Sequence, residues 1–172
     1  MKITTERLIL EPLSLKHLET THRFGSDPGN TRYMMFLPFE NIEETEQFIT
    51  EAAEEMKKPQ PAFYRMAVIH DGTHIGTVNL YLNEERTSAE FGWIIDKRFH
   101  GQGFATEAAS AFLDYAVNTL GIRSFSAHCD TENTSSRRVM EKLGMDLKSE
   151  HGGRKNRLSD EERREYLFEL TI

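Results

Sequence analysis

The sequence predicts one α/β (α+β) domain, in which helices flank a mixed, mostly antiparallel central sheet. Its 172 residues are the length of a single ordinary domain, here 1–172. Apolar runs joined by a strong hairpin signal, Asp71-Gly72, predict neighbouring antiparallel strands over 63–69 and 74–82. Other segments carry apolar residues at helical spacing and predict crossover helices. The expected order is β-α-α-β-β-β-α-β-α-β-β, which mixes hairpins with crossovers.

The N-terminal third is expected to form one strand and two helices. Residues 5–11 read as a strand with alternating leucines. Ser14 can cap the following helix, and Gly25 ends it. The second helix begins after Asn41, which forms a capping-box pattern with Glu44 and precedes an apolar stripe.

The centre of the chain changes its periodicity from strand to helix. Residues 88–95 are rich in aromatic and β-branched residues and predict a buried strand. A polar connection over 96–102 follows. From Gly103 to Gly121 the apolar residues recur at helical spacing, as Phe104, Ala105, Ala108, Ala109, Phe112, Leu113, Ala116, Val117 and Leu120. We therefore expect a long helix that ends at a C-terminal glycine.

The C-terminal part is expected to hold three short strands and one helix. A strand over 124–129 precedes a helix that Asn133 can cap. Two further strands are expected over 145–149 and 166–171. The charged stretch between them, 151–164, is expected to be a mobile loop because it is too polar to bury.

The strand, turn and helix around residue 100 have the composition of an anion site. Gly101 and Gly103 allow the backbone to approach a bulky ligand, and Ala105 and Thr106 keep the first helical turn uncrowded. The free N–H groups and the positive dipole end of the helix then face the space above the strand. The alternative interpretation is a tight loop with no ligand, since short glycine patterns are common.

The motifs HGQGFATEA, EFGWIID and ENTSSRRVMEKLGM resemble the acetyl-CoA-binding core of the GNAT superfamily of N-acetyltransferases. Within it they are most similar to the RimJ/RimL-like branch of ribosomal-protein N-terminal acetyltransferases. The superfamily pattern Gln/Arg-x-x-Gly-x-Gly/Ala falls on His100, Gly103 and Ala105, and His100 departs from the usual Arg or Gln. The opening TERLILEPL also resembles the branch, with Glu11 where an arginine is usual.

The resemblance implies a GNAT fold that binds acetyl-CoA as co-substrate, with no metal. Its central strand is expected to splay from the next one and to lend main-chain groups to the pantetheine, with one N–H near Ile94 facing the thioester oxygen. The diphosphate is expected at the glycine turn, and Asn133 at the pantetheine amide. The implied cofactor-binding residues are Trp93, Ile94, Ile95, His100, Gly101, Gln102, Gly103, Phe104, Ala105, Thr106, Asn133 and Ser136.

Two residues are candidates for moving protons during acetyl transfer. Glu90 lies on the central strand, where its carboxylate can take a proton from the attacking amine. Ser136 lies in a first helical turn, where the RimJ/RimL-like branch carries a serine that can protonate the leaving thiolate. The alternatives are a solvated Glu90 and a Ser136 hydroxyl that only satisfies free N–H groups. Asn133 can act as helix cap and ligand at once.

Other reactive side chains do not form a recognisable set. His128 and Cys129 invite a nucleophile interpretation, but nothing in the sequence supplies a positioned base or a depressed thiol pKa. His70, His74 and His100 lack the spacing of a metal site. We expect a buried thiol, hairpin histidines and no bound metal.

The amino-acid composition indicates which kinds of binding partner to expect. The net charge is −7 and no basic cluster exists, so nucleic acid is not an expected partner, whereas a cationic amine is favoured. One cysteine excludes an internal disulfide, and no apolar run suits a membrane span or signal peptide, which predicts a cytoplasmic protein. We expect a monomer or homodimer that acetylates a protein N-terminus or a small-molecule amine. The alternative is a catalytically silent acyl-CoA-binding sensor or interaction protein with the same fold.

Overall fold

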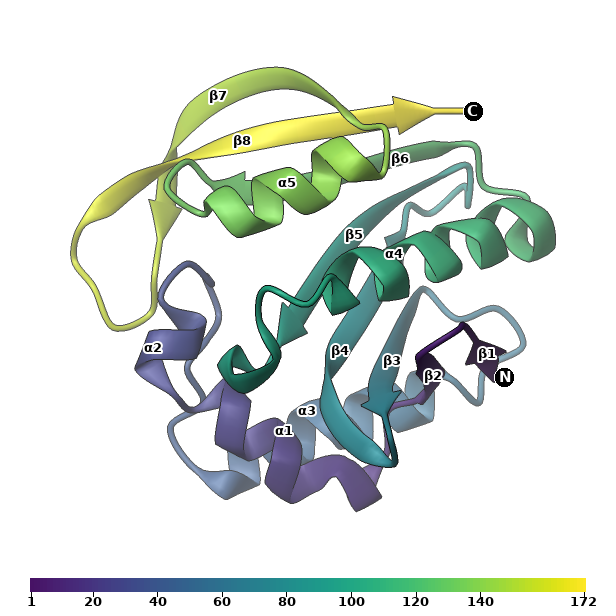
Figure 1. Cartoon of the computed structure of the whole chain (residues 1–172), viewed down its shortest axis with the longest axis horizontal. Helices are drawn as coiled ribbons and strands as arrows, with labels where there is room; N and C mark the ends of the chain where they lie inside the picture. The colour runs from purple at the N-terminus through teal and green to yellow at the C-terminus, as the bar shows by residue number, and fades with distance from the viewer.

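The computed structural model describes residues 1–172 and places every strand in one sheet, in the order β1-β2-β3-β4-β5-β6-β8-β7 (Figure 1). All neighbours pair antiparallel except β5 and β6, which are parallel. The sheet is thus mixed and mostly antiparallel, as predicted. The strands are β1 (Ile3–Thr4), β2 (Leu8–Pro12), β3 (Phe63–His70), β4 (Thr73–Leu82), β5 (Ser88–Ile95), β6 (Ser124–Asp130), β7 (Asp146–Lys155) and β8 (Glu162–Thr171).

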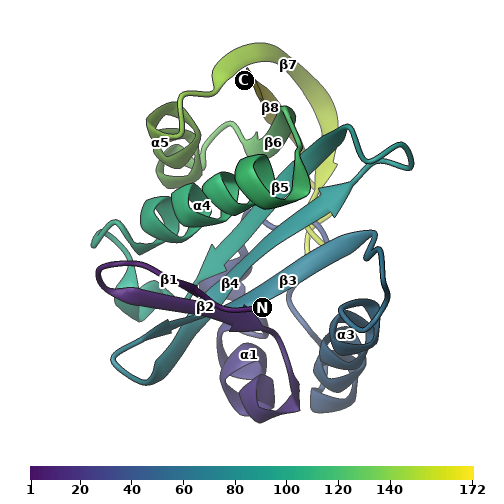
Figure 2. The ribbon, with the colours of Figure 1, turned by 90° about the vertical axis from the view of Figure 1, so that its right-hand side faces the viewer.

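Helices cover both faces of the sheet. Figure 2 shows α1 (Leu18–Gly25) and α3 (Ile42–Glu55) on one face, and α4 (Phe104–Tyr115) and α5 (Thr134–Lys142) on the other. A one-turn helix, α2 (Pro28–Thr31), follows α1, and a π-helical turn (Ala116–Leu120) continues α4. None of the helices is both long and apolar enough to cross a bilayer.

The caps expected at Asn41, Asn133 and Gly121 are present, whereas α1 begins after His17 without a side-chain cap. Asn41 Oδ1 accepts a hydrogen bond from Glu44 N at 2.8 Å at the start of α3, and Asn133 Oδ1 accepts one from Ser136 N at 3.1 Å at the start of α5. Gly121 ends the central helix with a φ of 75°. A polar side chain therefore satisfies one of the free N–H groups at the start of α3 and of α5, whereas Gly103 leaves those of α4 without a side-chain cap.

The core is built mainly between the sheet and α4. Phe112 of α4 packs edge-on against Phe91 of β5, and Phe125 of β6 lies beside Phe91. A smaller cluster of Leu13, Ile49, Ala52 and Ala67 seats α3 on the opposite face. This packing holds β5 between two helical layers and fixes the position of its C-terminal end.

The expected mobile loop over 151–164 is wrong, because most of these residues extend the terminal hairpin. β7 reaches Lys155 and β8 begins at Glu162. The charges pair across the strands: Arg154 Nη1 donates to Glu165 Oε2 at 2.5 Å, and Arg163 donates to Asp130 of β6. Oppositely charged side chains on neighbouring strands attract each other and stabilise the sheet, so a polar sequence can form a strand here.

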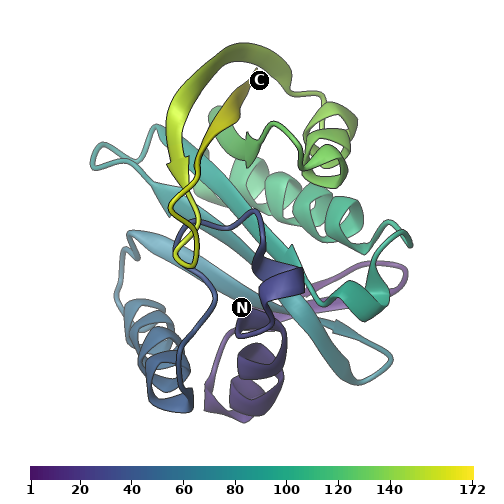
Figure 3. The same ribbon diagram turned by 90° about the vertical axis from the view of Figure 1, so that its left-hand side faces the viewer.

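The tip of this hairpin holds the connection between α2 and α3. Asn156 Nδ2 donates to the main-chain oxygens of Thr31, Met34 and Leu37, at 3.0, 2.7 and 3.2 Å. Figure 3 shows the hairpin end lying over this connection. Residues distant in sequence therefore meet beside the open end of β5.

Candidate active site

β5 and β6 diverge at the centre of the sheet. They pair only from Ser88 to Phe91 and from Ser124 to Ala127, although β5 continues to Ile95 and β6 to Asp130. The expected splay is therefore present. Asp96 N donates to Ile75 O of β4 at 2.8 Å. Successive N–H groups of a strand point alternately to its two neighbours, so every second residue before Asp96 also faces β4. Trp93 and Ile95 thus turn their N–H groups toward the gap and Ile94 turns its own toward β4, so the N–H expected near Ile94 belongs to a neighbour.

The turn after β5 has the conformation that its glycines predict. Gly101 and Gly103 have φ values of 77° and 82°, and Gly103 is the residue before α4. Arg7 Nη1 braces the turn by donating to Gln102 O at 3.1 Å. His100 Nε2 donates to Ile95 O at 2.7 Å, which ties the turn to the end of β5.

A groove of about 420 Å³, here called the turn groove, runs from this turn to the gap between β5 and β6. The predicted cofactor-binding residues that line it are Trp93, Ile94, Ile95, His100, Gly101, Gly103, Phe104, Ala105, Thr106, Asn133 and Ser136. Gln102 is the exception, since the residue does not line the groove and its carbonyl oxygen faces Arg7. The sequence pattern thus located a continuous surface.

Two cations of this groove were missed. Arg138 and Lys142 of α5 line it. They lie four residues apart on one helix face, which reads in a sequence as an ordinary solvated surface. Arg138 and Lys142 line the same groove as the free N–H groups of α4 only because α5 packs beside the turn.

A second cavity of about 250 Å³, here called the loop pocket, lies on the α1 and α3 face of β5. It is formed by α1, α3, the 34–39 loop, Arg154 of the hairpin, and β4 to β6. Met34, Trp93, Ile94, Asn133 and Ser136 line both the loop pocket and the turn groove. The two cavities therefore meet where the strands diverge.

Ser136 lies at this junction. Its Oγ accepts a hydrogen bond from the indole Nε1 of Trp93 at 3.3 Å, while its N–H donates to Asn133 Oδ1. The hydroxyl thus reaches across the gap to β5 and does not serve its own helix turn. Asn133 caps α5 and lines both cavities at once.

Glu90 lines the loop pocket and is more solvated than its place on a central strand suggested, with a side chain 51% exposed. Its Oε1 lies 3.3 Å from His128 Nδ1, which donates to it. This hydrogen bond raises the pKa of His128, against the opposing effect of its burial. Nothing local in the sequence signals this pair, because only the parallel register of β5 and β6 brings the two residues together.

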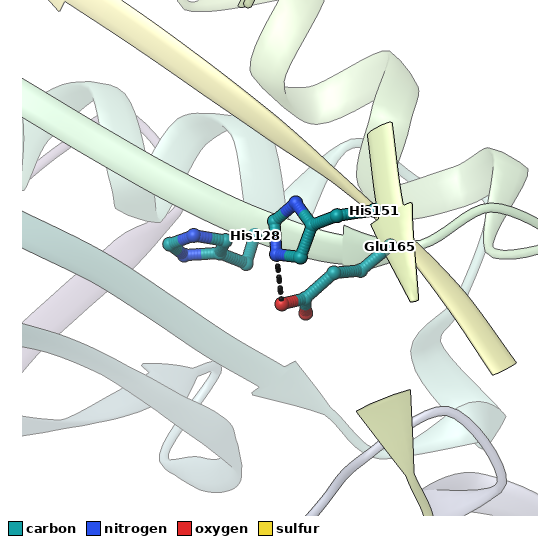
Figure 4. Close-up of side chains that lie close together, drawn as sticks. All are labelled: His128, His151 and Glu165. Atoms are coloured by element: carbon teal, nitrogen blue, oxygen red, sulfur yellow. Dashed lines mark hydrogen bonds and ion pairs between the residues drawn. The ribbon is translucent and has the colours of Figure 1, made fainter. Parts of the chain in front are cut away.

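His128 also belongs to a cluster with His151 and Glu165 (Figure 4), whose ligand-type atoms lie within 4.8 Å of one another. His151 Nε2 donates to one oxygen of Glu165 at 2.9 Å, and Arg154 donates to the other. The carboxylate is therefore satisfied by protein partners, and we assign the cluster to closing the hairpin onto β6. We considered His70, His74 and His100 as metal ligands from the sequence, and not this cluster. The absence of a bound metal therefore stays a prediction.

The remaining reactive groups are structural. Cys129 is buried, and burial raises the pKa of its thiol to about 11, which favours the protonated, unreactive thiol near neutral pH. His74 is buried under α1, and His70 lies beside the ring of Phe104. The expected buried thiol is confirmed.

Residues 7–146 match the model of the acetyltransferase (GNAT) domain family. The chain belongs to this family. Its GNAT membership makes the protein an N-acetyltransferase with acetyl-CoA as donor, and the resemblance of its motifs to the GNAT superfamily is confirmed. The eight-stranded sheet matches the GNAT fold.

Several known GNAT proteins are similar over nearly the whole chain. The uncharacterized N-acetyltransferase p20 of Bacillus licheniformis is 28% identical over 96% of this chain and 93% of its own. A GNAT acetyltransferase structure from Bacillus anthracis has a TM-score of 0.82 at 25% identity and covers 99% of this chain and 98% of its own. RimL, a ribosomal L7/L12 α-N-protein acetyltransferase solved with coenzyme A, has a TM-score of 0.87 at 15% identity over 100% and 98%, which shows a shared fold.

Proposed function

We propose that this protein transfers an acetyl group from acetyl-CoA to a primary amine by direct attack within a ternary complex. The observation that carries the proposal is the junction of the turn groove and the loop pocket at Trp93, Asn133 and Ser136. A donor in one cavity and an acceptor in the other would meet without a covalent enzyme intermediate. The acceptor is a protein N-terminus or a small-molecule amine.

The turn groove suits the donor. The diphosphate would lie against the first N–H groups of α4, at the positive end of the helix dipole. Gly101 and Gly103 keep that approach free of side chains, and Arg138 and Lys142 add positive charge from α5. The pantetheine would follow the gap between β5 and β6 and pair with the main chain of Trp93 and Ile95, as an added strand does.

The junction supplies groups for each step. The amine nitrogen attacks the thioester carbon, and Glu90 takes the proton that the nitrogen loses, directly or through water. A main-chain N–H of β5 stabilises the oxyanion of the tetrahedral intermediate. The carbon–sulfur bond then breaks, and the Ser136 hydroxyl relays a proton from solvent to the thiolate, so that the serine itself ends the step neutral. Trp93 orients that hydroxyl by donating to its oxygen.

The test is release of the CoA thiol from acetyl-CoA in the presence of single amines, with mass spectrometry of each product. The panel covers peptides with free N-termini, polyamines and apolar monoamines. We expect amine-dependent release with equimolar N-acetyl product. If the protein binds acetyl-CoA and acetylates nothing in the panel, it is a silent acyl-CoA-binding protein and the proposal fails.

A further inference from the structure

The walls of the loop pocket are formed largely by aromatic rings and methionines. The side chains that argue for its chemistry are Phe24, Met34, Met35, Phe36, Phe39 and Phe48. Phe36 is 81% exposed on the 34–39 loop, at the pocket lining. An apolar ligand in the cavity would cover the exposed Phe36 ring and lie against the buried rings of Phe24 and Phe39, so these walls favour an apolar ligand body.

The same pocket carries two oxygens without partners. Thr21 Oγ1 of α1 and Asn79 Oδ1 of β4 are buried with no hydrogen-bond partner, and both residues line the pocket. Buried polar atoms in folded proteins are nearly always hydrogen-bonded. Two unsatisfied oxygens on one cavity therefore indicate a ligand that brings N–H or O–H groups.

The sheet register opens a path between Asn79 and the reacting centre. Asn79 pairs with Gly92 of β5, and the next residue pair on that face is Tyr81 with Glu90. A Cβ added at Gly92 would lie 3.8 Å from Asn79 Nδ2 and 3.9 Å from the Tyr81 ring, in space that the glycine leaves free. The Asn79 amide can therefore approach the same ligand that Glu90 approaches.

The charges of the loop pocket select a cation and reject an anion. Glu90 presents a half-exposed carboxylate. The one guanidinium of the lining, Arg154, is paired with Glu165 and also donates twice to Tyr33 O. The other basic side chain of the lining, His128, donates to Glu90. Both basic side chains of the lining thus already have a carboxylate partner, so a ligand carboxylate or phosphate would find no unpaired cation, and burying an unpaired anion there would be costly.

We propose that the acceptor is a small monoamine with an aromatic or similarly apolar body and no carboxylate, whose N–H or O–H groups bind Asn79 and Thr21. This inference rests on the proposed acetyl transfer, because it names the acceptor of that reaction. It excludes free amino acids, polyamines and sugar amines as good substrates. Asn79 is a specificity-determining residue of the acceptor site.

The test compares matched amines at one pH. We expect kcat/KM for 2-phenylethylamine to exceed the values for phenylalanine, ethanolamine and putrescine by at least about tenfold. Phenylalanine differs from 2-phenylethylamine by the carboxylate alone, and ethanolamine carries a hydroxyl group in place of the ring. A preference for any of the three polar amines, or for a phenylalanine-initiated peptide amide over 2-phenylethylamine, would overturn the inference while leaving acetyl transfer intact. No turnover with any amine would refute the proposed function itself.

Two variants of pocket-lining residues, at Asn79 and Gly92, separate contact with the acceptor from a purely structural role. Asn79→Leu removes the buried oxygen at similar volume, so it should raise or preserve the melting temperature yet raise KM for 2-phenylethylamine at least about tenfold. Gly92→Ala places a methyl group between Asn79 and Tyr81 in the loop pocket. It should raise KM for 2-phenylethylamine, while KM for acetyl-CoA stays unchanged. If Asn79→Leu folds and keeps the wild-type KM, Asn79 contacts no acceptor and the inference is wrong. If Asn79→Leu does not fold, an unchanged acceptor KM in Gly92→Ala contradicts it.

Discussion

Mild acid should weaken the packing of α1 on the sheet through His74. This imidazole is 6% exposed; its Nε2 donates to Gly76 O at 2.8 Å, and its Nδ1 lies 2.6 Å from Thr20 Oγ1 of α1. Burial lowers the pKa of His74 from 6.5 to about 4, and the nearby His17 ring, 4.7 Å away between centroids, adds to the effect. A proton on His74 therefore disfavours the native state, in which α1 forms a wall of the loop pocket.

The sign follows from where the proton binds more tightly. The unfolded chain takes it up near pH 6.5 and the folded protein only near pH 4, so the stability from neutral His74 is complete above 6.5 and is lost as the pH falls toward 4. Between pH 7 and pH 5 this linkage removes about 2 kcal/mol from the free energy of unfolding, and full protonation removes about 3 kcal/mol.

The assay is urea unfolding at pH 7, 6 and 5, followed by far-UV circular dichroism and by the fluorescence of the single tryptophan. His74→Gln keeps a donor for Gly76 O but cannot titrate. We expect the variant to be less stable at pH 7 and to lose about 2 kcal/mol less than wild type between pH 7 and pH 5. His70→Gln, outside this packing, should follow wild type. Equal losses in wild type and His74→Gln would refute the assignment to His74.

Three further outcomes test the donor side. Gly103→Glu should abolish acetyl-CoA binding in calorimetry, because it strains a positive φ and puts a negative charge at the diphosphate, whereas His100→Ala should retain binding; the reverse result would refute the backbone cradle. Ser136→Ala should lower kcat between about tenfold and about 10⁴-fold with acetyl-CoA affinity nearly unchanged, and wild-type turnover would return Ser136 to a packing role. Arg138→Ala and Lys142→Ala should each weaken acetyl-CoA binding about tenfold at low salt and less at high salt, and affinities equal to wild type would show that neither contacts phosphate.

The parts of the fold predicted well are those with a local signal. The strand over 88–95, the glycine turn and the helix after Gly103 were predicted because periodicity and glycine placement act over a few residues. Asn41 and Asn133 cap their helices for the same reason. The residues proposed to hold the donor lie mainly on such segments, which is why the surface that they line could be predicted from the sequence.

The parts predicted poorly depend on distant partners. The hairpin over 146–171 forms because Arg154 and Arg163 find carboxylates on neighbouring strands, and nothing local signals those pairs. The contact of Glu90 with His128 requires the parallel register after a crossover helix. The 34–39 loop has no periodicity, so the sequence does not show that it lines the loop pocket. Its position depends on Asn156 at the hairpin tip, which binds main-chain oxygens of this loop.

The proposed mechanism depends most on Glu90 as the base. An alkyl amine with a pKa near ~10 is almost wholly protonated at neutral pH and cannot attack until a base removes its proton. The deciding measurement is the pH dependence of kcat/KM for wild type and Glu90→Gln with one amine that the thiol-release assay has identified. We expect the variant to be slower at pH 7 and to recover partly at high pH, where free amine becomes abundant. Parallel profiles of equal magnitude would contradict the account and leave the proton to water or to His128.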